Sequence, residues 1–106
     1  MLKSPDHLTE SSRDWWLGIV GEYDLEAHHL RLLTLAAEAW DRGQQARETV
    51  AKEGAFYLNK AGEPRAHPGV AVERDSRIAY ARLMRELDLD GVPEPDIRPP
   101  RIQSRT

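Results

Sequence analysis

The sequence contains no cysteine among its 106 residues. This absence excludes a disulfide scaffold, a thiolate zinc or iron–sulfur site, and a cysteine nucleophile. The sequence also has no long hydrophobic run, because its most apolar stretch, residues 30–40, includes Arg31 and Glu38 and is too short to span a membrane. The first six residues have no apolar segment after Lys3. We therefore expect no signal peptide, no membrane partner and a cytoplasmic location.

Positive charge is not in excess either. The chain has 15 lysines and arginines against 18 acidic residues, which gives a formal net charge of −3. A protein with this balance is not a general polycation that coats nucleic acid. Most of its cations are arginines, which suit bidentate contacts with carboxylates or phosphates. The simplest expectation is ion pairing within and between chains.

Motifs for nucleotide binding and catalysis are missing. Neither GxxxxGK[ST] nor GxGxxG occurs in the sequence. His28 and His29 are adjacent, so on a helix they diverge and do not bind one metal ion. Carboxylate pairs such as Glu94 and Asp96 lie in a proline-rich segment, whereas a two-metal nuclease needs a rigid frame. We therefore expect no enzyme, no catalytic residues, no cofactor and no metal site, with a metal-dependent nuclease as a minor alternative.

A first helix is expected over residues 9–20, after a disordered lead of residues 1–8. Trp15 and Trp16 are neighbours, so they point about 100° apart on a helix. We expect one of them to pack against the next helix and the other to lie at a subunit boundary or stay partly exposed. The candidates for the N-cap are Thr9, Ser11 and Ser12.

The longest element is a helix expected over residues 24–53, with Asp24 as its N-cap and Gly54 as its stop. About thirty residues give a rod of roughly 45 Å, which is long for a domain whose radius of gyration should be about 13 Å. The helix is apolar on two sides, so we infer that part of it is covered by another copy of the chain, and we expect Trp40 to be buried. The expected oligomer interface consists of Leu32, Leu35, Ala36, Ala39, Trp40, Ala46 and Val50.

A short β-hairpin is expected within residues 55–67, because a strand-like run is followed by a turn-rich segment. His67 is expected to cap the next helix or to pack under the hairpin. Pro68 opens that third helix at its first position, and Leu89–Gly91 close it. Acidic residues flank the arginine face of this helix, so we expect a solvated, ion-paired face. That face consists of Arg74, Arg77, Arg82 and Arg85.

The chain changes character at residue 92. Four prolines prevent a helix in residues 92–106, and the three arginines Arg98, Arg101 and Arg105 make its end basic. The sequence thus predicts a mainly α protein with a helical oligomerisation domain over residues 9–91 and a flexible basic tail.

The segment from Gly54 to Leu89, GAFYLNKAGEPRAHPGVAVERDSRIAYARLMRELDL, resembles the small subunit of phage terminases. The resemblance lies in a long helix, a glycine, a short β segment, a His67–Pro68 pair and a final helix that ends in Leu-x-Leu. It extends over roughly residues 8–91.

This resemblance implies a non-enzymatic homo-oligomeric ring in the host cell cytoplasm. Such a ring recognises viral double-stranded DNA at the start of packaging and delivers it to the large subunit, which carries the ATPase and nuclease. Many small terminases have an N-terminal helix-turn-helix, but here only one helix precedes the long one, and Arg13 is its only cation. The alternative is a small self-associating helical scaffold or regulator that binds only protein. Under the terminase hypothesis the expected DNA contacts are Arg98, Arg101, Arg105, Lys60 and Arg65.

Overall fold

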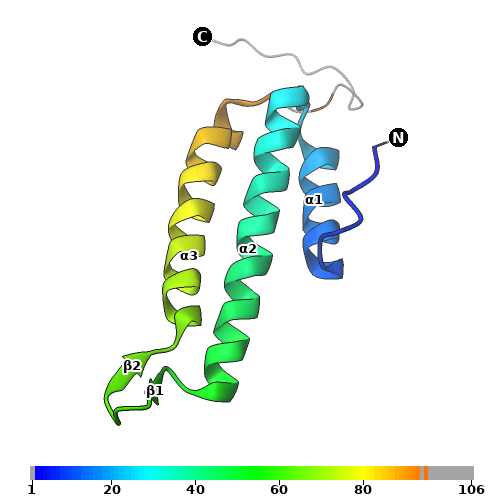
Figure 1. Cartoon of the computed structure of the whole chain (residues 1–106). Helices are drawn as coiled ribbons and strands as arrows, with labels where there is room; N and C mark the ends of the chain where they lie inside the picture. The colour runs from blue at the N-terminus through cyan, green and yellow to red at the C-terminus, as the bar shows by residue number, and fades with distance from the viewer. Residues whose placement is uncertain (1, 94, 96–106) are drawn as a thin grey trace.

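The computed structural model describes residues 2–93 and residue 95, and over this part the chain is mainly α-helical. The expected order of helix, long helix, hairpin and third helix is confirmed. The elements in chain order are α1 (Glu10–Glu22), α2 (Ala27–Glu53), β1 (Phe56–Leu58), β2 (Pro64–Ala66), α3 (Pro68–Leu87) and the short 3-10 helix η1 (Leu89–Gly91) (Figure 1).

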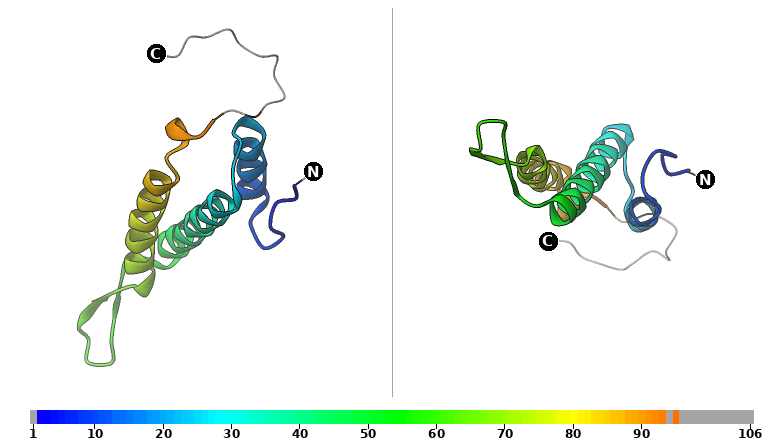
Figure 2. Two further views of the ribbon diagram at one scale, coloured as in Figure 1. Left: turned by 90° about the horizontal axis from the view of Figure 1, so that it is seen from above. Right: turned by 60° about the horizontal axis from the view of Figure 1, so that its bottom comes forward.

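The three helices lie in a row with α2 in the middle (Figures 1 and 2). Helix α3 runs back along α2, α1 lies beside the first half of α2, and the hairpin projects from the far end. The radius of gyration is 18.9 Å, against about 13 Å for a compact domain of this length. The molecule is therefore elongated, and much of its surface is not shared between helices.

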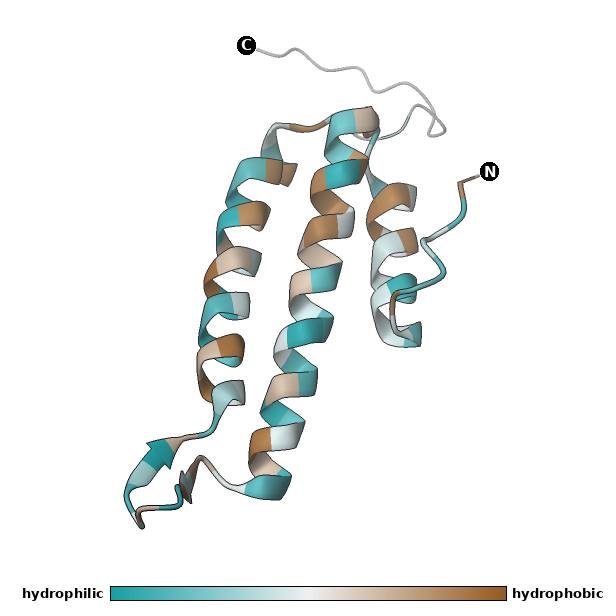
Figure 3. Ribbon diagram, viewed as in Figure 1, coloured by the Kyte–Doolittle hydropathy of each residue, from teal (hydrophilic) through white to brown (hydrophobic). Residues whose placement is uncertain are grey.

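The two apolar sides of α2 are partly covered within the single chain. Helix α1 covers one side and α3 covers the other. Figure 3 shows that apolar residues are concentrated in the first half of α2, where both neighbours lie. The expectation that one stripe needs a second copy of the chain is therefore wrong for the residues that α3 covers.

Small residues allow α2 and α3 to approach closely. A Cβ at Gly43 would lie 3.2 Å from the Cβ of Ser76, and a Cβ at Gly69 would lie 2.9 Å from Val50 Cγ2. Gly43 therefore occupies a helix interior despite its cost of about 1 kcal/mol relative to alanine. Three alanines that the sequence placed in an oligomer interface are buried within the chain itself, which corrects that assignment. They are Ala36, Ala39 and Ala46.

The main core lies where α1, α2 and the end of α3 meet. It is formed by Leu8, Trp16, Leu33, Ala37 and Leu87. The indole Nε1 of Trp16 donates to Thr34 Oγ1 at 3.1 Å, so this ring is both buried and hydrogen-bonded. The expectation that one of the paired tryptophans packs against the long helix is confirmed. Leu8, expected in a disordered lead, is 4% exposed and belongs to this core.

The start of α1 follows the local capping rules, whereas the start of α2 differs from the expected one. Thr9 caps α1, and its hydroxyl accepts from the backbone N–H of Ser12. Helix α2 begins at Ala27, later than expected, and Glu26 replaces Asp24 as its N-cap. The backbone N–H of Asp24 instead donates to the carbonyl of Pro93 at 2.7 Å. A contact distant in sequence thus holds the α1–α2 connection in a non-helical conformation.

The C-terminal boundary also differs from the expected one. Asp88 ends α3 in the left-handed region with φ of 50°. Val92 is buried, and Pro93 accepts the hydrogen bond from Asp24. The packed part of the chain therefore continues past Gly91. Most of the basic tail, including residues 96–106, lies outside the residues that the structure describes.

His67 caps α3 and joins it to α2. Its Nδ1 accepts from the backbone N–H of Gly69 at 2.9 Å, and its Nε2 lies 2.7 Å from Glu53 Oε1. Because Nδ1 accepts, the ring proton is on Nε2 and is donated to the carboxylate. The capping role expected for His67 is confirmed.

We expect His67→Ala to lower the free energy of unfolding by about 1 kcal/mol, because the N-terminal N–H of Gly69 loses its acceptor. His67→Asn should recover most of this loss, since asparagine is a good N-cap. Urea unfolding followed by circular dichroism measures both values. Equal stability of the alanine variant and the parent protein would contradict the capping role.

Candidate functional site

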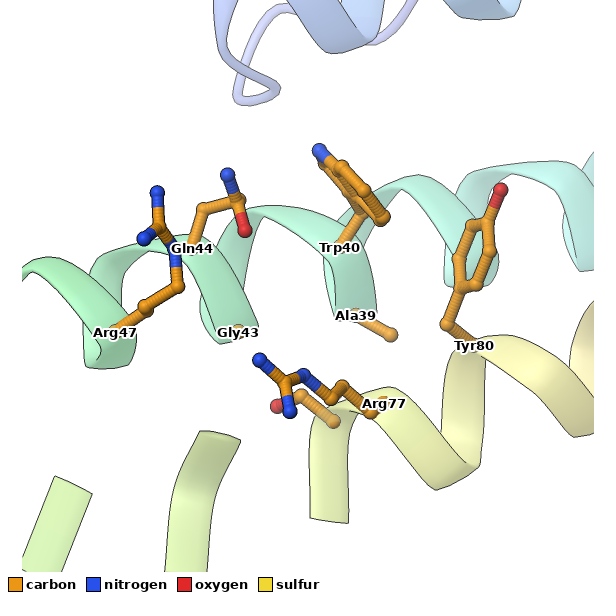
Figure 4. Close-up of a pocket in the computed structure, with 8 residues that line it drawn as sticks. Ala39, Trp40, Gly43, Gln44, Arg47, Arg77 and Tyr80 are labelled. Carbon is orange, nitrogen blue, oxygen red and sulfur yellow. The ribbon is translucent and has the colours of Figure 1, made fainter. Parts of the chain in front are cut away.

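One aromatic side chain from each helix contributes to a cluster on the surface. The rings of Trp40 and Tyr80 have centroids 5.3 Å apart, and those of Trp15 and Tyr80 are 6.3 Å apart. Trp40 is 48% exposed, so its expected burial is wrong. The side of α2 that meets α3 is occupied by small residues such as Ala39 and Gly43, and Trp40 lies at the edge of this contact (Figure 4).

Two hollows meet at this cluster, and we call them together the aromatic groove. One has a volume of about 380 Å³ and the other about 390 Å³, and both include Trp40 and Tyr80. Figure 4 shows Gln44 and Arg47 beside Trp40 along α2, and Arg77 facing them from α3. The remaining lining residues are Ala39, Gly43 and Ser76 in the first hollow and Ser11, Ser12 and Trp15 in the second.

The floor of the aromatic groove is neutral. Burial raises the pKa of Tyr80, so its hydroxyl keeps its proton at physiological pH. Positive charge lies at one end only, on Arg47 and Arg77, and Arg77 pairs with Glu73 on its own helix. A neutral aromatic surface that is exposed to solvent is typical of a protein interface. Sequence periodicity placed Trp40 on an apolar stripe but did not show that its ring stays uncovered.

A polar cluster around Asp41 holds α1 beside the groove. The carboxylate accepts from the backbone N–H of Thr9 at 2.9 Å, from the Thr9 hydroxyl at 2.8 Å and from the Ser12 hydroxyl at 2.5 Å. His7 Nε2 lies 2.6 Å from Glu38 Oε2, one turn before Asp41 on α2. Burial raises the pKa of Asp41, but the hydrogen bonds from Ser12 and Thr9 and the nearby His7 outweigh it, so that the pKa is lowered overall.

We expect this lowered pKa to make the protein less stable in acid. A carboxyl whose pKa is lower in the folded state stabilises the fold above its unfolded pKa of about 3.9, and this contribution is lost as pH falls through the folded pKa. Asp41→Asn should cost about 1–2 kcal/mol at pH 7 and should reduce the loss below pH 4. Urea unfolding from pH 7 to pH 3 measures this difference. A variant whose pH profile runs parallel to that of the parent would contradict the role of Asp41.

The cations expected to contact DNA are only partly placed by the structure. Lys60 lies in the loop between β1 and β2, and Arg65 lies on β2, so the hairpin brings both together. Arg65 pairs with Glu63 at 3.1 Å, and all three side chains are exposed. The tail arginines 98, 101 and 105 lie outside the described residues.

The arginine face of α3 is partly ion-paired, as expected. Arg74 contacts Asp75 at 3.2 Å, and Arg77 contacts Glu73 one turn earlier. Arg82 and Arg85 form no ion pair within 4.0 Å among residues 2–93 and 95.

The hairpin has one wholly apolar face that sequence reasoning missed. Phe56 pairs with Ala66, and Leu58 pairs with Pro64. Residues directly opposite each other on antiparallel strands share a face. The two-residue spacing of Phe56 and Leu58 already indicates that they share one face of a strand. The residues opposite them are known only from the strand register in the structure.

Two features are absent from the described part of the chain. No cluster of three or more potential ligands occurs within residues 2–93 and 95. The Nδ1 atom of His29 accepts a hydrogen bond from the backbone N–H of Glu26 at 3.0 Å. No helix that the structure describes is long and apolar enough to cross a membrane.

The described part of the chain is thus an elongated helical frame with an exposed aromatic groove and a projecting hairpin that carries Lys60 and Arg65. The chain belongs to the family of phage terminase small subunits, whose family model matches residues 14–100. Small terminase subunits are non-catalytic and take part in phage DNA packaging. No curated protein and no solved structure matches the chain.

Proposed function

We propose that this protein recognises viral double-stranded DNA at the start of packaging, delivers it to the large terminase subunit and regulates that subunit. The family match over residues 14–100 carries this proposal. The large subunit of a terminase supplies ATP hydrolysis and DNA cleavage, so the small subunit needs surfaces for DNA and protein rather than an active site.

The proposed DNA contacts are cationic and mostly peripheral. Lys60 and Arg65 project on the hairpin, away from the helical core. The three tail arginines follow several prolines, and no acidic residue follows Asp96. These contacts are directed mainly to phosphates, which position a protein on DNA without reading its sequence. Repetition around an oligomeric ring makes the cationic surface substantial despite the acidic chain.

Self-association is the second part of the proposal. Leu35 and Trp40 are 49% and 48% exposed, although both belong to the apolar surface of α2. Leu32 and Val50 are half-buried. These four members of the expected interface remain available at least in part, whereas the three alanines are buried within the single chain.

Two measurements on the full chain test the proposal. Mass photometry or light scattering at micromolar concentration should show an oligomer, and fluorescence anisotropy should show binding to a DNA duplex. The affinity should fall linearly with salt on a log–log scale, with a slope of about −0.9 per neutralised phosphate. A folded 12.1 kDa monomer that binds no DNA at low salt would overturn the proposal. An oligomer without DNA affinity would favour the scaffold or regulator instead.

A further inference from the structure

The hairpin exposes an apolar face that no residue of the described part of the chain covers. Phe56 is 70% exposed and Leu58 is 69% exposed, and their strand partners Ala66 and Pro64 are exposed as well. An isolated two-stranded hairpin is at best marginally stable in water. A face of this composition is therefore expected to be buried against another surface.

The aromatic groove is a second apolar surface, and the residues that the structure describes leave it open to solvent. Trp40 is 48% exposed, and the two hollows beside it are large enough to receive side chains such as those of Phe56 and Leu58. Aromatic side chains around a concave surface are the usual composition of an interface core. The groove and the hairpin thus have matching chemistry and complementary shapes, one hollow and one projecting.

The hairpin does not reach the groove of its own chain. Trp40 lies roughly 20 Å along α2 from Glu53, the end from which the hairpin projects outward (Figure 1). The base of the hairpin is fixed there, because the backbone N–H of His67 donates to the carbonyl of Ala55 at 2.7 Å and the ring of His67 contacts Glu53. Contact between the hairpin and a groove therefore requires a second copy of the chain.

Charge is divided around the groove: the wall that α1 forms is acidic, Arg47 and Arg77 lie at one end, and the hairpin is cationic, so its charge complements the α1 wall. Helix α1, which forms one wall of the groove, carries three acidic residues and one arginine. The hairpin carries Lys60 and Arg65 against one acidic residue, Glu63. Complementary charge of this kind orients two copies before their apolar surfaces meet.

We propose that the apolar face of the hairpin in one copy docks into the aromatic groove of the next copy. The two contact surfaces are different, so the interface is heterologous, and repetition of it generates a closed ring or an open filament. This inference rests on the proposed self-association and assigns the surfaces that carry it. Phe56 and Leu58 are inserted beside Trp40 and Tyr80 of the neighbouring chain.

Engineered cysteines test the contact without background, because the natural chain has none. Leu58→Cys and Ser11→Cys, prepared separately and mixed, should form a covalent heterodimer with a short bismaleimide, and the double variant should form a ladder of oligomers. Ser11 lines the groove and is exposed. Asp90→Cys, exposed near the opposite end of α3, should not react with Leu58→Cys. Crosslinking of Leu58→Cys with itself alone would overturn the proposal in favour of a hairpin-to-hairpin contact.

Matched charge variants provide an independent readout. Leu58→Glu should shift the oligomer to monomers in light scattering, whereas Tyr57→Glu, on the other hairpin face, should leave it assembled. Both side chains are at least 50% exposed in the single chain, so neither change should unfold it, and circular dichroism checks this. An oligomer that persists with Leu58→Glu would overturn the hairpin contact but not the proposed function. A parent protein that is monomeric would overturn both the hairpin contact and the proposed self-association.

Discussion

Trp16→Ala is expected to lower the free energy of unfolding by about 3–5 kcal/mol, the range for removal of a buried aromatic side chain. Trp16 is 4% exposed and packs among Leu8, Leu33 and Leu87, where α1, α2 and α3 meet. The change also leaves Thr34 without its indole donor. Since small domains have total stabilities of about 5–15 kcal/mol, the variant should melt at a much lower temperature or be largely unfolded.

Trp40→Ala is the matched control, because it removes the same type of side chain from a position that is not buried. Its ring is half exposed and its main aromatic partner is Tyr80, so the expected cost in a single chain is about 1 kcal/mol. Urea unfolding at concentrations where the chain is monomeric compares the two variants. A larger loss for Trp40→Ala than for Trp16→Ala would contradict the observed burial of the two rings.

The second large effect is expected for DNA binding. Replacement of Arg98, Arg101 and Arg105 by glutamine should lower the affinity for duplex DNA at least tenfold at low salt. Loss of three phosphate contacts per chain should also reduce the log–log salt slope by about 2.7. Between 50 and 200 mM salt the parent protein loses affinity by some factor. For the variant this factor should be about 40 times smaller for each chain that contacts DNA, because the slope differs by about 2.7. Anisotropy titrations with a labelled duplex give both quantities.

The control for this variant is Lys60→Gln with Arg65→Gln, which removes the hairpin cations and keeps the tail. Substitution is preferable to truncation at Gly91, because Val92 is buried and Pro93 accepts a hydrogen bond from Asp24. If the tail variant binds DNA as tightly as the parent protein, the DNA surface is the hairpin or the helices. The next residues to replace would then be Arg13, Arg74 and Arg77.

Local patterns in the sequence were sufficient to predict the helices, the hairpin and most of their boundaries. Thr9 as N-cap, Gly54 after the long helix, and the His67–Pro68 start of α3 are all read from neighbouring residues, because caps and first-turn prolines act within one turn. The resemblance to terminase small subunits rested on the order of such short features, and the family match confirms it. The predicted start of α2 was wrong, because the backbone N–H of Asp24 donates a hydrogen bond to the carbonyl of Pro93, which is far away in the sequence.

The tertiary structure alone decided what covers each side of α2. Periodicity shows that a helix has two apolar stripes, but it does not distinguish α1 and α3 of the same chain from a second molecule. The close contact of Gly43 with Ser76 buries the alanines of one stripe and leaves Trp40 at its edge. Strand register likewise placed Phe56 and Leu58 on one face with Pro64 and Ala66. Exposure depends on which elements meet in space, so the aromatic groove and the apolar hairpin face were decided by packing between segments distant in sequence.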